Sequence, residues 1–262
     1  RKMLGVAPNP HLGHADELLY GIACQQDTHA SYRPTQVGVF FGNRQQADGQ
    51  VVPDPYFDGN GPERNVCQRC GGCMVGCRHN AKNTLPKNYL YFAEKLGACI
   101  QPEAEVRDIQ PLPAGQSDGA RYELVFQRPT AWLVRFPRRV RARTVVISAG
   151  SLGTQRLLFR CRDVSGSLPA ISQRLGDMVR TNSETLLGAT SPHKQVDYSQ
   201  GVAITSIYNP DPVTAAEPVR YPAGSSLIRL LAGPLAAYDG SLGQRMVHIL
   251  GQIITRPRDF YR

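Results

Sequence analysis

Four cysteines crowded into eleven residues constrain this chain more than any other feature of its sequence. They are separated by two, two and three residues, at Cys67, Cys70, Cys73 and Cys77. Thiolates this close together can converge on one metal centre, and the loop that carries them contains Gly71, Gly72 and Gly76. The spacing is that of bacterial ferredoxins, except that Arg78 stands where proline follows the fourth cysteine there.

Three interpretations of this loop stay open. The four cysteines could hold an iron–sulfur cluster, which would make the chain an electron-transfer protein. They could instead hold zinc, which would stabilise the loop of a basic binding module. The third interpretation is a glycine-rich loop that folds without metal. Disulfides are less expected, because no apolar secretory segment follows Arg1 and thiols stay reduced inside cells. We therefore expect a cytoplasmic protein.

Composition narrows the class of protein further. Of the 262 residues, 41% are hydrophobic and 19% charged, as in a folded protein rather than a disordered one. No apolar run approaches the roughly 18 residues that a membrane-spanning helix needs, so we expect no membrane span. The net charge is +9, but the basic residues are spread along the chain. A nucleic-acid-binding protein is expected to cluster them with aromatic residues, so we expect no nucleic-acid partner.

Hydrophobic periodicity predicts both helices and strands. Helices are expected over 15–26, from Thr84 to Leu96, after Gly153 and from Met246 to Ile254. Strands are expected over 98–109, 120–127 and 139–149, with short β-rich runs at 185–190 and 201–208.

The third predicted strand runs directly into a glycine turn. Its apolar run 145–147 is typical of a buried strand, and Gly150 and Gly153 follow it before a helical pattern begins. Such a turn presents free backbone amides at a helix N-terminus, which favour a phosphate group. The turn lacks the third glycine and the acidic ribose partner of a full dinucleotide motif, so a tight turn without ligand is equally compatible with it.

Three stretches together resemble a known enzyme family. The first runs from Cys70 through Lys82-Asn83-Thr84-Leu85 to Asn88-Tyr89-Leu90 and Ala93-Glu94. The second is the strand–glycine–helix stretch over 145–158, and the third covers 174–184. Together they resemble the glucose-methanol-choline (GMC) oxidoreductases, in particular the cholesterol-oxidase-like branch, in which a Cys-rich loop precedes the helix that contains Asn-Tyr-Leu.

The resemblance implies an enzyme that binds FAD and transfers a hydride to the flavin from a C–OH group of an alcohol or sterol-like substrate. It implies an α/β (α+β) fold, with a partial Rossmann-like FAD-binding domain and β-meander over 1–170 and part of an antiparallel substrate-domain sheet over 171–262. The residues that match cofactor-binding positions of the family are Val106, Ala149, Gly150, Gly153, Thr154 and Asn182.

Two parts of the family pattern are missing, namely the N-terminal Gly-x-Gly-x-x-Gly turn and the C-terminal active-site histidine with its partner. We therefore expect an internal fragment whose partners are the remaining N- and C-terminal parts of the same polypeptide. Alone, it should bind FAD poorly and be inactive. We assign no catalytic residue in this chain, because the chemistry needs a general base and none of His79, His193 and His248 stands in a context that matches the family's active site.

Overall fold

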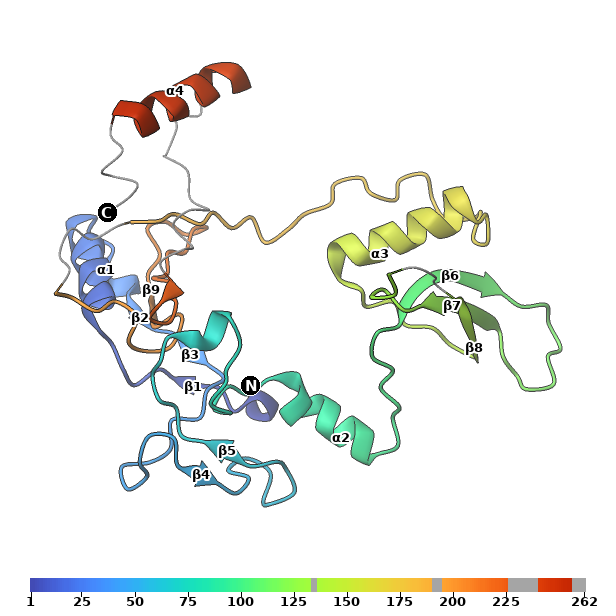
Figure 1. Cartoon of the computed structure of the whole chain (residues 1–262), viewed down its shortest axis with the longest axis horizontal. Coiled ribbons are helices and arrows are strands. Elements are labelled where there is room, and N and C mark those ends of the chain that lie inside the picture. The colour runs from blue at the N-terminus through green and yellow to red at the C-terminus, as the bar shows by residue number, and fades with distance from the viewer. Residues whose placement is uncertain (133–135, 190–194, 226–239, 256–262) are drawn as a thin grey trace. The chain divides into compact units, whose positions relative to one another are not determined.

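The computed structural model describes residues 1–132, 136–189, 195–225 and 240–255. These residues form helices and small antiparallel sheets (Figure 1), which confirms the expected mixed α+β class. The α-helices are α1 (His14–Gln25), α2 (Tyr89–Lys95), α3 (Gly150–Phe159) and α4 (Leu242–Thr255). None of the helices in the described ranges is long and apolar enough to cross a membrane.

The strands are short except for three. The short ones are β1 (Ala7–Pro8), β2 (Arg33–Pro34), β3 (Gln36–Val37), β4 (Val51–Val52), β5 (Arg64–Asn65) and β9 (Ser206–Ile207). The longer ones are β6 (Glu105–Pro111), β7 (Tyr122–Gln127) and β8 (Arg138–Ala142). Single helical turns complete the structure, namely η1 (Lys2–Leu4), η2 (His29–Ser31), η3 (Gly72–Met74) and η4 (Leu85–Lys87), with a π-helical turn, η5 (Arg160–Val164).

Contacts divide the chain into two compact units. Unit 1 combines Arg1–Ala98 with Leu187–Arg262, and unit 2 is the uninterrupted stretch Cys99–Leu186. Neither boundary coincides with residue 170, at which we expected a cofactor domain to give way to a substrate domain. That expectation concerns function rather than compactness, and it stays a prediction.

Unit 2 is built on a meander of β6, β7 and β8, which pair antiparallel in sequence order (Figure 1). Val106 lies opposite Phe126, and Leu124 lies opposite Val140. Branched and aromatic side chains pack well on a pleated sheet surface, so the predicted strand over 120–127 forms as β7. The first strand begins later than expected, because a turn with positive φ at Glu103 precedes it.

The chain leaves β8 without forming the expected strand over 145–147. No strand of the described residues pairs with this run, and Val146 is 83% exposed. A buried strand of the parallel type is stable only between hydrogen-bonded neighbours. The strand prediction is therefore wrong at this point, whereas the helix expected after the glycine turn is present as α3.

The helix predicted from Thr84 to Leu96 is divided. The turn η4 is followed by α2, and Asn88 between them departs from helical geometry, with φ of −143°. Asn88 is fully buried, and its side chain accepts a 2.7 Å hydrogen bond from the Tyr89 amide and donates one to the Thr84 carbonyl. A buried asparagine thus caps α2 and stops the preceding turn from continuing into it.

Unit 1 has a small core beside the cysteine loop, formed by Val39, Cys67, Ala81 and Val202. Two-residue strands pair β1 with β3, β4 with β5, and β2 with β9. The last pair joins Arg33 to Ile207, so the two separate stretches of unit 1 meet in one sheet. The β-rich run over 201–208 thus contributes a strand, whereas the described part of the run over 185–190 does not.

Candidate functional site

A cavity of about 930 Å³ lies in unit 2 and is lined by parts of that unit alone. Its wall comes from the start of β6, from the run 145–149 and from the helical stretch formed by α3 and η5. The aliphatic residues of this wall include Ile109, Leu124, Val145, Ile147, Leu157 and Val164. An apolar wall with a few charged groups is typical of a cofactor or ligand site.

The cavity brings together three of the residues predicted to bind a cofactor. Val106 on β6 lines it, together with Ala149 at the N-cap of α3 and Gly153 within that helix. Gly150 and Thr154 lie beside them on α3 but do not line the cavity. Gly150 has a positive φ of 71°, a conformation that other residues adopt only with strain, so the glycine is needed for the turn itself.

The charged side chains of the wall favour an anionic ligand. Arg107 donates a 2.7 Å hydrogen bond to Glu105, whose pKa burial would raise but which hydrogen bonds and nearby arginines keep lowered. Asp163 is paired with Arg162, which holds the pKa of that carboxyl below its usual value. Arg156 and Arg160 also line the cavity, four residues apart on one helical face. The wall therefore carries three arginines against two carboxylates. Arg156 and Arg160 were not foreseen from the sequence, although their helical spacing could have identified them.

The sixth predicted cofactor residue, Asn182, lies elsewhere. It is exposed, in a stretch without regular structure, and does not line the cavity. Of the three histidines set aside, His79 lines a small cavity at the cysteine loop, and His248 lies on α4 within 2.6 Å of Gln252. His193 lies outside the described residues.

The cysteine loop forms part of the apolar core. Cys67 is buried, and Cys73 and Cys77 pack against the cluster that contains it. Burial raises the pKa of the Cys67 thiol to about 11 and also raises that of Cys73, so both are protonated at neutral pH. Buried thiols of this kind behave as small apolar side chains.

The geometry gives the predicted metal site at Cys67, Cys70, Cys73 and Cys77 no support. Across the described ranges, no group of three or more His, Cys, Asp or Glu side chains is placed to hold a metal ion. The cavity that the four cysteines share measures only about 10 Å³, and the described cysteines form no disulfide. What the structure does show is that Cys67, Cys73 and Cys77 pack in or against the small apolar core of unit 1.

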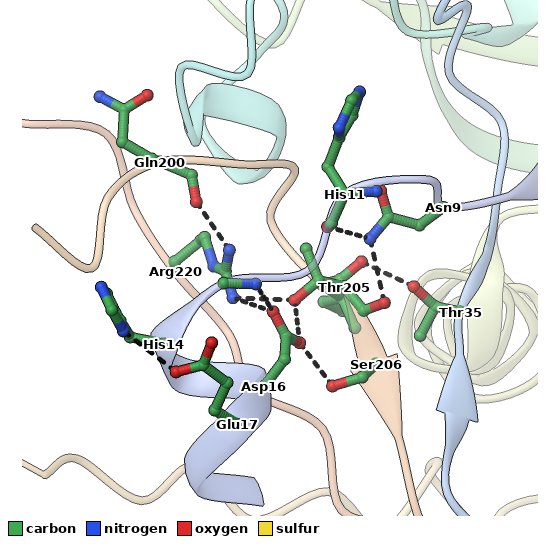
Figure 2. A network of polar contacts seen from close by, with 12 residues as sticks. Asn9, His11, His14, Asp16, Glu17, Thr35, Gln200, Thr205, Ser206 and Arg220 are labelled. Atoms are coloured by element: carbon green, nitrogen blue, oxygen red, sulfur yellow. Dashed lines mark hydrogen bonds and ion pairs between the residues drawn. The ribbon is translucent and has the colours of Figure 1, made fainter. Parts of the chain in front are cut away.

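A buried polar network in unit 1 was not foreseen from the sequence (Figure 2). Asp16, in the first turn of α1, accepts hydrogen bonds from the hydroxyls of Thr205 and Ser206 and, at 2.8 Å, from the Gly13 amide. Arg220 lies 3.3 Å from the same carboxylate and donates to the Thr205 hydroxyl and to the Gln200 carbonyl.

This network is suited to stabilising the fold and not to catalysis. Burial alone would raise the pKa of Asp16, but its hydrogen bonds and the charge of Arg220 keep it below the ordinary value, so the carboxylate is ionised. Both charged side chains are at least 93% buried. An ionised carboxylate whose lone pairs are all engaged is a poor general base. The only local signal was an acidic residue at the third helical position, and nothing in the sequence pointed to its partner 204 positions away.

Known proteins resemble this chain over nearly all of it. It is 46% identical to a cholesterol oxidase of Acinetobacter baumannii over 100% of its length, which is 47% of that relative. It is 45% identical to a cholesterol oxidase of Mycobacterium tuberculosis over 93% of its length, which is 42% of that relative. No family model matches the chain, and no solved structure matches it. The chain spans less than half the length of either relative. It therefore belongs to the cholesterol-oxidase-like branch of the GMC oxidoreductases.

Proposed function

We propose that this chain supplies part of the FAD site of an oxidoreductase that acts on the C–OH group of an alcohol or sterol-like substrate. The observation that carries the proposal is the meeting of Val106, Ala149 and Gly153 at one cavity in unit 2. These residues were matched to the family's cofactor positions by sequence alone. The relatives, which are cholesterol oxidases, support the reaction class.

The residues of the cavity fit the chemistry of a dinucleotide. The first amides of α3 have no partner within the helix, and such amides favour a phosphate. The excess of arginine over carboxylate in the wall favours the same charge, and the apolar side chains of β6 suit a flat heteroaromatic ring. When bound, FAD would supply the acceptor for a hydride from the carbon that bears the hydroxyl.

Each part of the chain has a distinct task in this proposal. The backbone of Val106 would meet the adenine ring, while Gly150 shapes the turn and Gly153 leaves room for the ligand to approach α3. The match of Thr154 to the family's ribityl-facing turn stays a prediction, because Thr154 lies on α3 beside the cavity and not in its wall. The contribution of Asn182 stays a prediction. The general base at the alcohol hydroxyl is not assigned to any residue of this chain.

A titration of the isotope-labelled chain with FAD, followed by NMR, tests the proposal. We expect weak, saturable shifts confined to β6, the run 145–149 and α3. Gly153→Val should reduce the affinity, because its side chain would occupy the cavity. Gly188→Val is the matched control, since Gly188 lies in open space outside this cavity and should leave the affinity unchanged. Shifts spread evenly over the chain, or equal binding by both variants, would contradict the proposal.

A further inference from the structure

Asp108 on β6 forms a cluster of hydrogen bonds behind the wall of this cavity. Its side chain is buried, with the residue 8% exposed, and it follows a bulge in the pairing of β6 with β7 between Val106 and Asp108. Asp108 Oδ1 accepts hydrogen bonds from Ser165 Oγ at 2.8 Å and from Ser167 Oγ at 2.6 Å. The Ile109 amide donates to the same oxygen at 3.0 Å.

The two serines belong to the segment that ends the helical wall of the cavity. After α3 the helix widens into the π-turn η5, where the Ser165 amide donates to the Arg160 carbonyl at 3.0 Å. Cys161 in this turn is fully buried, and the hydroxyls of Ser165 and Ser167 also lie within 3.5 Å of its carbonyl oxygen. Turns of the π type are rare, and those that do occur are frequently found at functional sites. The hydrogen bonds from Ser165 and Ser167 to Asp108 link this turn to β6.

The cluster joins the two sides of the cavity. Arg107, the residue before Asp108, lines the cavity from β6, while Arg160 and Asp163 line it from η5. From this arrangement we propose that Asp108 is a positioning residue, which fixes the π-turn against β6 and so sets the spacing of the cavity walls that grip the ligand. The inference rests on the proposed function, because it takes that ligand to be an adenine dinucleotide.

The charge of Asp108 fits this role. Burial would raise its pKa, but hydrogen bonds from Ser167, Gln110 and Ser165 keep it lowered, so the group is ionised and accepts at both oxygens. A carboxylate is a stronger acceptor than a neutral group, and hydroxyl bonds to it are short. Truncating Asp108 would remove the carboxylate oxygen that both serine hydroxyls share, and would leave the hydroxyls with weaker contacts to the Cys161 carbonyl at 3.4–3.5 Å.

Three variants separate the hydrogen bonds of this cluster from its charge. Asp108→Ala removes the acceptor, and the double variant Ser165→Ala/Ser167→Ala removes the donors. Both should weaken ADP binding about tenfold or more, and both should speed hydrogen exchange over residues 160–168. Asp108→Asn retains an oxygen that can accept from both serines, and it should bind ADP within about threefold of the unaltered chain.

Ala120→Gly is the control for general loss of stability. Ala120 is buried in unit 2 but lies outside the cavity lining. If this variant melts as low as Asp108→Ala yet binds ADP normally, the positioning role holds. If it loses the same affinity, or if Asp108→Ala and the serine variant bind normally, the inference is overturned. Failure of the unaltered chain to bind ADP and FAD would instead overturn the proposed function, and with it this role of Asp108.

Discussion

Asp16 and Arg220 form an ion pair that closes a loop of about 200 residues. Their side chains lie 3.3 Å apart, and both are buried in unit 1. A buried pair gains little over an apolar pair of similar shape, but loss of one partner leaves an isolated charge in the core. The pair therefore matters mostly through the cost of breaking it.

We expect Asp16→Asn to lower the free energy of unfolding by about 3–5 kcal/mol, because Arg220 would be left buried without a counter-ion. Urea denaturation measures the change. The double variant Asp16→Asn/Arg220→Met should recover part of the loss, since it removes the orphaned charge as well. Glu17→Gln is the matched control, because Glu17 pairs with His14 on the exposed side of the same helix. A loss in the double variant as large as in the single one would contradict this explanation.

The raised pKa of Cys67 predicts a loss of stability at alkaline pH. Burial moves the pKa of this thiol from an ordinary 9.0 to about 11 in the folded chain. Stability from the buried thiol is complete below pH 9 and is lost as the pH rises towards 11, because the unfolded chain releases the proton first. The loss should reach about 2–3 kcal/mol in this range.

Urea denaturation between pH 8 and pH 11 tests this expectation, and Cys67→Ala should show a smaller decline. Cys24→Ala should decline like the unaltered chain, since Cys24 is exposed. The expectation is refuted if Cys67→Ala and the unaltered chain show the same slope.

At the scale of elements, the cysteine loop depends on one glycine more than on the others. Gly71 has a φ of +68°, and a Cβ there would lie 2.3 Å from the Ser199 carbonyl oxygen. The Gly71 amide also donates to the Gly201 carbonyl at 2.8 Å, so the loop is paired closely with the later segment. These close backbone contacts hold the loop against the later segment.

Two matched substitutions in this loop give a direct test. Gly76 also has a positive φ, of +100°, but a Cβ there would meet nothing within 4 Å. Gly76→Ala should cost about 1–2 kcal/mol through backbone strain alone. Gly71→Ala should cost clearly more, because it adds a clash with a carbonyl that cannot move aside. Thermal melting of both variants measures the difference, and equal melting temperatures would count against the close packing of Gly71.

Elements with their own periodicity could be predicted from the sequence, and elements that need distant partners could not. The helix expected over 15–26 is α1, and the one expected from Met246 is contained in α4. The run 145–147 has the composition of a buried strand, but composition does not reveal whether neighbouring strands are present. The break at Asn88 depends on its burial, which local pattern does not encode.

For the candidate site, too, residues in a local pattern could be predicted and contacts between distant residues could not. Val106, Ala149 and Gly153 could be named from a family pattern, and the structure brings them to one cavity. The cluster around Asp108 could not be named, because its serines lie 57 and 59 positions further along the chain. The cysteine spacing alone could not decide between metal binding and core packing, because thiols of either kind can share one sequence pattern.

At the scale of the whole molecule, the two units are expected to respond separately to mutation. The network of Asp16 lies within unit 1, and the cluster of Asp108 lies within unit 2. Hydrogen exchange measured by mass spectrometry should show Asp16→Asn loosening α1 and β9 while β6 and β7 stay protected. Asp108→Ala should give the opposite pattern. Loss of protection in both units from either change would show that the chain unfolds as a single cooperative body.

The division of the chain also bears on the order in which it folds as it is synthesised. Unit 2 is one continuous stretch, so all the residues that it needs have left the ribosome soon after Leu186 has been added. Unit 1 is different, because its first segment, Arg1–Ala98, cannot complete its native contacts until its second segment, Leu187–Arg262, has been synthesised. Until Arg220 emerges, the carboxylate of Asp16 has no counter-ion and β2 has no partner in β9. Of the two units, the first segment of unit 1 is therefore synthesised before unit 2 but reaches its native contacts after it.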